Sequence, residues 1–525
     1  MPTSLSAPFT SSISKMSLYK VLGRRCIGDF AIPWSKGIRG LRGYSRGLSN
    51  ASNEPAASTM MLDVCHLPVM TSSWKAVKSL NKACTEYANL NGDPQKHIEE
   101  ALAEDPCCVM AHCLKGLLTA LEHNNPGAVV TSLERAEKEL AAGSTGNSTR
   151  DGDAWKREEM FVATLGSWSA GRWRQGALQL ERWLMTAPID LLALKLAQDA
   201  HLLLGDAANV RDCVARVFPC WNEGVFGYPN VLGMYAFGLA ENGAYPAAEE
   251  HADLAMARRR EDMWAVHAMS HVYEMEARAS EGCSFLTEAR EDWEDKPGPL
   301  TAHLAWHLGM FSLERGLGAR TLRVFDSLLM PRGEGGRETG SPRGAPPSPF
   351  ALADACSLLW RMDIYGVETG PHRWRSVAEA WSKHEQTRHL STFLDLHAIM
   401  AFSAMMEFSE GGANGSGADD DVERDTWVER AEGVVSSMRD YVGSQASWSG
   451  SGDAVGGEKE PNPGGNTPPG VVELHSFSPG RRPGSRGAKD LGSVDLLQGG
   501  PPDNLWVAEN LGLPLCEAIL AYKKG

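Results

Sequence analysis

The sequence lacks the features that mark membrane-spanning and disulfide-rich proteins. No stretch approaches the roughly 20 apolar residues of a spanning helix, so an integral membrane protein is excluded. The eleven cysteines include no Cys-x-x-Cys pair and no regular framework, and their odd number indicates reduced thiols. A Walker A loop, a GxGxxG turn after a strand and a GxSxG elbow are absent as well, so three common enzyme classes are not indicated.

Positive charge is scarce. Lys and Arg number 51 against 66 Asp and Glu, and the net charge of −15 argues against bulk nucleic-acid binding, which requires a basic face. Apolar residues make up 42% of the 525 residues, which is enough for one or two sizeable cores. The 54 glycines and 29 prolines exceed the usual share, and the excess lies in a few stretches, which predicts disordered inserts in an otherwise globular chain.

Residues 1–59 form a leader of different composition. Its first 53 residues hold eight Lys or Arg, ten serines and a single acid, Asp29. This composition is typical of a transit peptide, and RGYSRGLS (residues 42–49) resembles mitochondrial processing sites, so we expect a mitochondrial protein and otherwise a cytoplasmic one. Two alternatives are a disordered basic tail and a segment upstream of a true start at Met60 or Met61.

From about Ser72 onward the chain has the periodicity of helices. Apolar residues recur every three or four positions, with little of the alternation typical of strands, which predicts an all-α fold. Glycines that we interpret as helix breaks recur at spacings of 34, 38, 39 and 36 residues, at Gly171, Gly205, Gly243, Gly282 and Gly318. This is the spacing of tetratricopeptide (TPR) repeats, in which each repeat is a helical hairpin of about 34 residues.

The expected architecture is a TPR-like α-solenoid of about six or seven stacked hairpins. A single hairpin cannot bury its apolar face alone, whereas stacked hairpins can, and their first helices usually line the concave side. We expect these repeats over residues 65–330 and 350–443, interrupted by disordered Gly/Pro/Ser-rich inserts at 331–349 and 444–503 and a shorter loop at 411–421. Residues 504–525 predict a terminal helix with an exposed apolar stripe, which either packs back onto the last hairpin or indicates a truncated array.

A family resemblance is carried by five segments in a fixed order: LALKLAQDAHLLLGD (192–206), VARVFPCW (214–221), DMWAVHAMSHVYEM (262–275), DACSLLWRMDIYGV (354–367) and LGLPLCEAIL (511–520). Together they resemble the tetratricopeptide repeat protein 38 family, over roughly residues 65–330, 350–408 and 505–525. The resemblance implies a TPR-like fold and brings no catalytic assignment. Members of that family lack the basic leader and the long inserts and continue beyond the position of Gly525.

Two histidine pairs carry the most informative chemistry. His267 and His271 are four residues apart, Glu274 follows three residues later, and all three share one helical face. His303 and His307 are again four apart. Each pair lies 15 and 11 residues before an interpreted break, at Gly282 and Gly318, so we expect equivalent positions in adjacent hairpins. Adjacent helices pack roughly 10 Å apart, which would bring the five side chains together on the inner face.

Three interpretations of this patch remain open. Imidazoles at i and i+4 suit Zn²⁺ or another divalent metal, with Glu274 as a further ligand or a general base. The pattern is not HExxH, so protease chemistry is not implied. The same side chains could instead line a groove that binds a peptide or a small polar ligand, or they could simply pack.

Polar residues within other apolar helical stretches are weaker candidates. Asp199 and Asp395 could accept a hydrogen bond from a metal-binding imidazole, and His397 lies two residues after Asp395. His112 and Asp354 have similar surroundings. We count Asp199, Asp395 and His397 with the histidine patch as candidate ligand-binding residues.

The function predicted from these observations is a binding scaffold. Its His-rich concave groove would hold a protein, a peptide or a polar ligand, with no role for nucleic acid. The alternative is a metal-dependent hydrolase or related enzyme that uses the histidines and Glu274.

Overall fold

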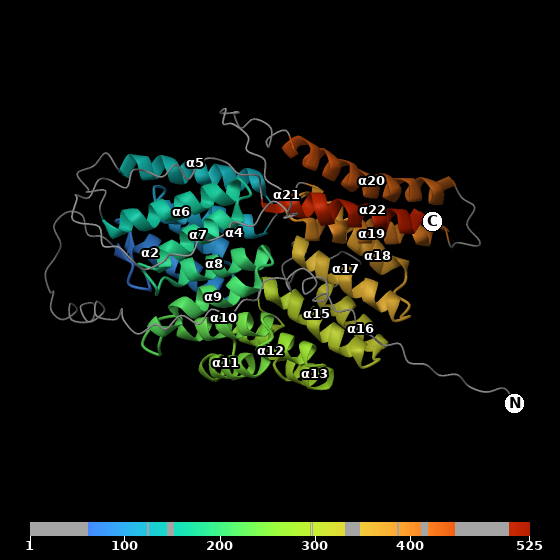
Figure 1. The fold of residues 1–525 in the computed structure, drawn as a ribbon, viewed down its shortest axis with the longest axis horizontal. Helices are drawn as coiled ribbons and strands as arrows, with labels where there is room; N and C mark the ends of the chain where they lie inside the picture. The colour runs from blue at the N-terminus through green and yellow to red at the C-terminus, as the bar shows by residue number, and fades with distance from the viewer. Residues whose placement is uncertain are drawn as a thin grey trace, which may run out of the picture.

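The computed structural model describes residues 61–122, 125–143, 152–294, 296, 298–330, 347–385, 388–410, 418–446 and 503–524, and these residues are almost entirely helical (Figure 1). The predicted leader, residues 331–346 and residues 447–502 lie outside the described residues. Within the described parts of the chain, no helix combines the length and apolar character needed to cross a bilayer.

Nine consecutive helix pairs form the described array, more than the six or seven predicted. In chain order the pairs are α2 (Trp74–Asn89) with α3 (Pro94–Glu104), α4 (Val109–Glu122) with α5 (Pro126–Gly143), α6 (Asp153–Ser169) with α7 (Trp173–Leu184), α8 (Leu191–Leu203) with α9 (Ala207–Val217), α10 (Tyr228–Glu241) with α11 (Tyr245–Arg258), α12 (Met263–Met275) with α13 (Ala279–Glu288), α15 (Pro299–Glu314) with α16 (Gly318–Val324), α17 (Pro349–Ile364) with α18 (Pro371–Trp381), and α19 (Thr392–Glu410) with α20 (Ala418–Ala446). The array is therefore an all-α helical repeat.

A few short elements complete the fold. α14 (Arg290–Trp293) follows α13, and α21 (Asp503–Val507) and α22 (Leu513–Lys524) end the described chain. Two strands that the sequence analysis missed, β1 (Met61–Leu62) and β2 (Pro68–Val69), form an antiparallel hairpin before α2. Helix α20 begins at residue 418, inside the loop predicted at 411–421.

Seven of the pairs share one turn geometry. The first helix ends at a left-handed residue with φ between 52° and 78°, and the next N–H donates to the carbonyl five residues earlier. This is the Schellman arrangement, which satisfies carbonyls that a helix end leaves unpaired. The left-handed residues are Leu90, Gly171, Gly205, Gly243, Ala277, Gly316 and Gly366.

Two of the predicted breaks are therefore wrong. Gly282 lies inside α13, where a Cβ would meet the ring of Phe311, and Gly318 is the first residue of α16. The turns of these two pairs are made by Ala277 and Gly316 instead. The Ala277 turn could not be recognised because the sequence analysis looked for glycine, the residue that adopts positive φ at least cost.

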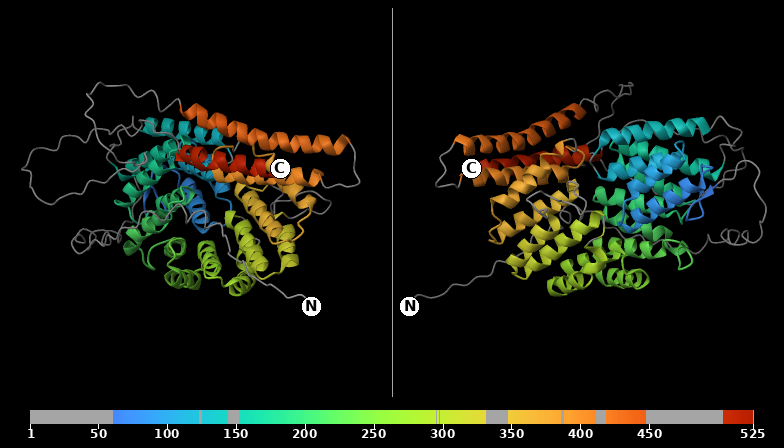
Figure 2. Two further views of the ribbon diagram at one scale, coloured as in Figure 1. Left: turned by 45° about the vertical axis from the view of Figure 1, so that its right-hand side comes forward. Right: turned by 180° about the vertical axis from the view of Figure 1, so that it is seen from behind.

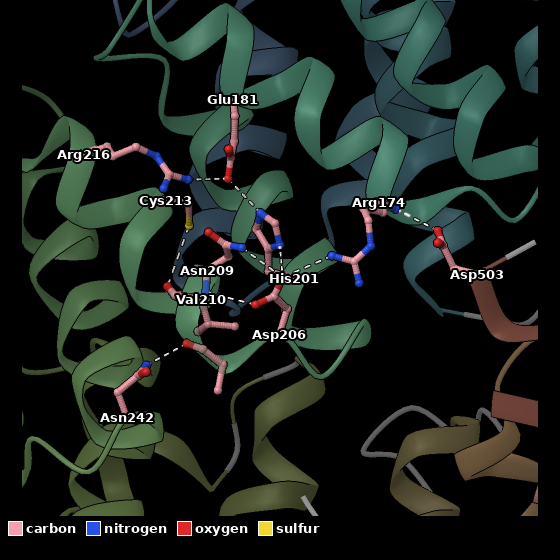
Figure 3. Close-up of polar contacts among 11 residues, drawn as sticks. Arg174, Glu181, His201, Asp206, Asn209, Val210, Cys213, Arg216, Asn242 and Asp503 are labelled. Carbon is pink, nitrogen blue, oxygen red and sulfur yellow. Dashed lines mark hydrogen bonds and ion pairs between the residues drawn. The ribbon is translucent and has the colours of Figure 1, made fainter. Parts of the chain in front are cut away.

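The pairs follow a curved path (Figure 1). Pairs α2 to α9 form one side, α10 to α13 form the bend, and α15 to α20 form the other side. α21 joins the two sides: Asp503 N–H donates to the Gly171 carbonyl at 3.0 Å, and Arg174 N–H donates to Asp503 Oδ2 at 2.9 Å. Figure 3 shows Arg174 between Asp503 and Asp206, whose Oδ2 lies 3.4 Å from the guanidinium.

The terminal helix packs back onto the last pair, which was one of two predicted outcomes. α22 lies along α19 and α20, with Cys516 and Leu520 buried (Figure 2). Arg439 of α20 and Glu517 form an ion pair across this contact. The predicted apolar stripe comprises Leu511, Leu515 and Ile519, of which Leu515 is exposed, so the buried stripe is rotated from the predicted one.

The C-terminal end of α2 packs against first helices of later pairs. The Tyr87 hydroxyl donates to Asp199 of α8 at 2.5 Å, and the Asn230 amide of α10 donates to the Ala88 carbonyl at 3.2 Å. Gly298, just before α15, approaches the Leu90 carbonyl so closely that a Cβ would not fit. The side where we expected an open groove is therefore partly filled by the chain's own first pair.

The buried carboxyl group of Glu158 in α6 predicts a pH-dependent stability. Its Oε1 accepts from Met70 N–H at 2.7 Å, and its Oε2 is buried without a hydrogen bond. Burial raises the pKa of Glu158 to about 7. A carboxyl group with a raised folded-state pKa costs stability as pH rises from its unfolded pKa to its folded pKa, here from about 4.5 to about 7.

Glu158→Gln removes this cost. Between pH 5 and pH 8, we expect the free energy of unfolding of the variant to rise by about 3 kcal/mol relative to that of the unsubstituted protein. Urea unfolding at both pH values measures the difference, with Glu159→Gln, at an exposed neighbour, as the control. A difference that does not depend on pH would contradict the prediction.

Candidate metal centre

Helices α12 and α15 pack side by side and bring together four imidazoles. Asp262 caps the start of α12 by accepting from Ala265 N–H at 2.9 Å, and the four-residue spacing puts His267 and His271 on one face. His303 and His307 face them from α15. One nitrogen from each of the four side chains lies within 4.8 Å of the others. We call these four residues the histidine cluster.

Three of the four imidazoles have a carboxylate at Nδ1. Glu241 Oε1 lies 2.9 Å from His271, Asp354 Oδ2 lies 2.9 Å from His303, and Glu274 Oε2 lies 3.1 Å from His307. The carboxylates come from α10, α12 and α17, so three different pairs contribute. A carboxylate at Nδ1 fixes the ring and directs Nε2 away from it, as in carboxylate–histidine–zinc arrangements.

Aromatic rings enclose the cluster. His267 stacks on Phe237 with ring centroids 4.9 Å apart, and His303 stacks on Trp306 at 5.4 Å. Trp306 is itself held by a 2.9 Å hydrogen bond from Nε1 to Ser357 Oγ. Trp264 contacts both Phe237 and His267. These rings cover part of the cluster and lower the local dielectric, which strengthens electrostatic interactions within it.

Burial sets the protonation of the cluster. His267 is 4% exposed and His307 is 1% exposed, and burial lowers the pKa of both, of His267 well below its usual value and of His307 to about 3. Burial also opposes charge on His271, but Glu241 outweighs it and raises the pKa of that imidazole. Neutral imidazoles present a free lone pair, the form in which histidine binds a metal.

Among the described residues, four buried nitrogens of the cluster have no hydrogen bond: Nδ1 of His267, Nδ1 of His271 and both nitrogens of His307. The Nδ1 atoms of His271 and His307 lie within ion-pair distance of Glu241 and Glu274, whereas Nδ1 of His267 and Nε2 of His307 have no such contact. The Nε2 atoms of His267 and His271 lie 2.8 Å apart. An ion 2.0–2.1 Å from each nitrogen in a tetrahedron would hold the nitrogens roughly 3.4 Å apart, between this distance and the 4.8 Å limit of the cluster. The donor set therefore fits a divalent metal with modest side-chain adjustment.

The structure brings together the five side chains predicted for the patch, although the register behind the prediction was wrong. Counted from the true turns, His267 and His271 lie 10 and 6 residues before Ala277, whereas His303 and His307 lie 13 and 9 residues before Gly316. The offset of three residues is close to one helical turn, so the faces still meet.

The remaining candidates lie outside the cluster. Asp199 pairs with buried Lys195 and accepts from Tyr87. Asp395 does contact an imidazole, at 3.4 Å, but it is that of His389. His397 donates from Nδ1 to the Phe393 carbonyl, and His112 donates from Nε2 to the Pro106 carbonyl. All four therefore take part in local packing and hydrogen bonding.

Sequence reasoning missed one member of the site and understated another. Glu241 was not singled out, although it ends α10 two residues before the turn at Gly243. Asp354 was noted only as an acid in an apolar stretch, whereas it is the partner of His303. Both contacts join different helix pairs, so only the packing of pairs could reveal them. The sequence matches no protein-family model.

Proposed function

We propose that this protein is a metal-binding helical-repeat protein that holds a divalent ion such as Zn²⁺ in the histidine cluster. The observation that carries the proposal is the convergence of four imidazole nitrogens within 4.8 Å, three of them backed by carboxylates. Nitrogen donors suit zinc and its transition-metal neighbours and do not suit Ca²⁺ or Mg²⁺, which prefer oxygen. The burial of His267 and His307 favours an ion over a peptide as their ligand.

The array around the site supports a second role, as a binding scaffold. We propose that the helix pairs are TPR-like, since their turns recur at 34 to 39 residues from Gly171 to Gly316. The five segments that resemble the tetratricopeptide repeat protein 38 family support a relation to that family. A surface hollow on α2, lined by Met61, Trp74, Lys78 and Lys82, offers a place for an acidic peptide. Lys82→Glu should weaken the binding of such a peptide without changing the metal content of the protein.

Metal analysis tests the main proposal. The full chain, stripped with a chelator and titrated with Zn²⁺ against a chromophoric competitor, should bind one ion per chain with a Kd below micromolar. Elemental analysis of the protein as purified should find the same stoichiometry. Absence of saturable zinc binding, with Co²⁺ and Cu²⁺ equally unbound, would overturn the proposal.

A further inference from the structure

The four imidazoles differ in whether a carboxylate lies next to their Nδ1 atom. His271, His303 and His307 each have a carboxylate 2.9–3.1 Å from Nδ1. Among the described residues no carboxylate lies within ion-pair distance of His267, and its ring is held by stacking on Phe237. A carboxylate orients an imidazole and raises its basicity, so three rings are built as strong ligands and His267 is not.

We infer that the ion has three fixed ligands, His271, His303 and His307, and one exchangeable position, which His267 occupies only until a small anion replaces it. This inference rests on the proposed function and specifies the ligand of the same site. Three histidines with an open fourth position are the arrangement of zinc sites that bind water or substrate, whereas structural zinc sites are closed by four protein ligands.

Access and charge on one side of the cluster favour an anion. His303 is its most accessible imidazole, with a side chain 26% exposed. The Arg361 guanidinium lies over the ring of Trp306, 5.6 Å from its centroid, near enough to Glu274 and Asp354 for their charges to act on it. Its hydrogen bond goes to the Ser357 carbonyl, and no carboxylate lies within ion-pair distance of it in the described part of the chain. A carboxylate or phosphate oxygen bound to the metal would meet this positive charge.

Asp354, Ser357 and Arg361 follow one another at spacings of three and four residues on α17, so they share one helical face. That face contacts His303 through Asp354 and Trp306 through Ser357. The same face therefore fixes one metal ligand and presents the guanidinium. This arrangement places Arg361 where it can select the charge of the fourth ligand.

Cobalt substitution in the full chain tests the inference. Co²⁺ gives visible absorption bands that report its coordination, and we expect azide, inorganic phosphate and acetate, added separately, to shift the bands of the loaded protein. His267→Ala should still bind the ion, with less than a 10-fold loss of affinity for Co²⁺. In His303→Ala, the affinity for Co²⁺ should fall by more than 100-fold. Arg361→Gln should weaken anion binding at least several-fold with cobalt content unchanged. Arg320→Gln, at a half-buried arginine of α16 that donates to Thr287, should leave anion binding unchanged.

The outcomes separate the two proposals. If the unsubstituted protein binds no Co²⁺ or Zn²⁺, the metal-binding function itself fails. If the ion binds but His267→Ala costs as much affinity as His303→Ala, and no anion shifts the bands, the site is a closed four-histidine centre and the inference is wrong. If phosphate shifts the absorption bands and acetate does not, the site accepts phosphate; if acetate alone shifts them, the site accepts a carboxylate.

Discussion

Replacing His307 by alanine is expected to abolish tight zinc binding. His307 is almost fully buried, its Nε2 has no hydrogen bond to any residue that the structure describes, and its Nδ1 faces Glu274. Loss of a supporting carboxylate alone typically costs 10–100-fold in metal affinity, so loss of the ligand should cost more than 100-fold. Competitive titration with Zn²⁺ measures the change.

A graded series makes this result specific. Glu274→Gln should lower the affinity for zinc by 10–100-fold, because it removes the negative charge beside Nδ1 of His307 and leaves the His307 imidazole in place. His112→Ala is the matched control, since His112 lies on α4 and donates to a backbone carbonyl there. Equal zinc affinity in His307→Ala and His112→Ala would exclude the histidine cluster as the metal site.

Arg157→Met is expected to be the most destabilising substitution in the N-terminal half, lowering the free energy of unfolding by about 3–5 kcal/mol. Arg157 is 1% exposed and lies 2.7 Å from Asp63 and 2.8 Å from Asp190. Asp190 is fully buried and also caps α8 by accepting from Ala193 N–H. Methionine fills much of the same volume but leaves two carboxylates without a counter-charge.

The control for Arg157→Met is Arg439→Met, which removes an arginine–carboxylate pair on the surface. Arg439 and Glu517 have half-exposed side chains, and such pairs contribute about 1 kcal/mol or less. Chemical unfolding of both variants measures the contrast. If Arg157→Met loses no more stability than Arg439→Met, the buried network of Arg157, Asp63 and Asp190 does not hold β1 and β2 onto α6 and α8.

Periodicity was sufficient to predict the helical class and the meeting of the two histidine pairs, because both depend on which face of a helix a residue occupies. The turns were harder to predict. The helix break predicted at Gly282 lies at Ala277 instead. The two histidine pairs still meet because the resulting error in register was close to one helical turn.

Contacts between distant segments could not be read from local pattern. Asp354 lies 51 residues from His303, and the pairing of Glu241 with His271 depends on how α10 packs on α12. Asp199 looked like a polar residue of the groove, but α2 folds back over α8 and supplies Tyr87 as its partner. These positions follow from the path of the whole array and are independent of the local helical period.

The contact between Asp503 and the turn of α6 and α7 has a mechanical consequence. A helical repeat array with free ends can extend and bend along its length, whereas hydrogen bonds between its two sides, such as those of Asp503 with Gly171 and Arg174, restrict this motion. α12 lies in the bend on the side of the molecule opposite α21, and α15 follows it (Figure 1). Parting of the two sides at Asp503 would change the angle between α12 and α15, and with it the distances among the four imidazoles. Asp503 therefore connects the two sides at a point from which their separation would reach the histidine cluster.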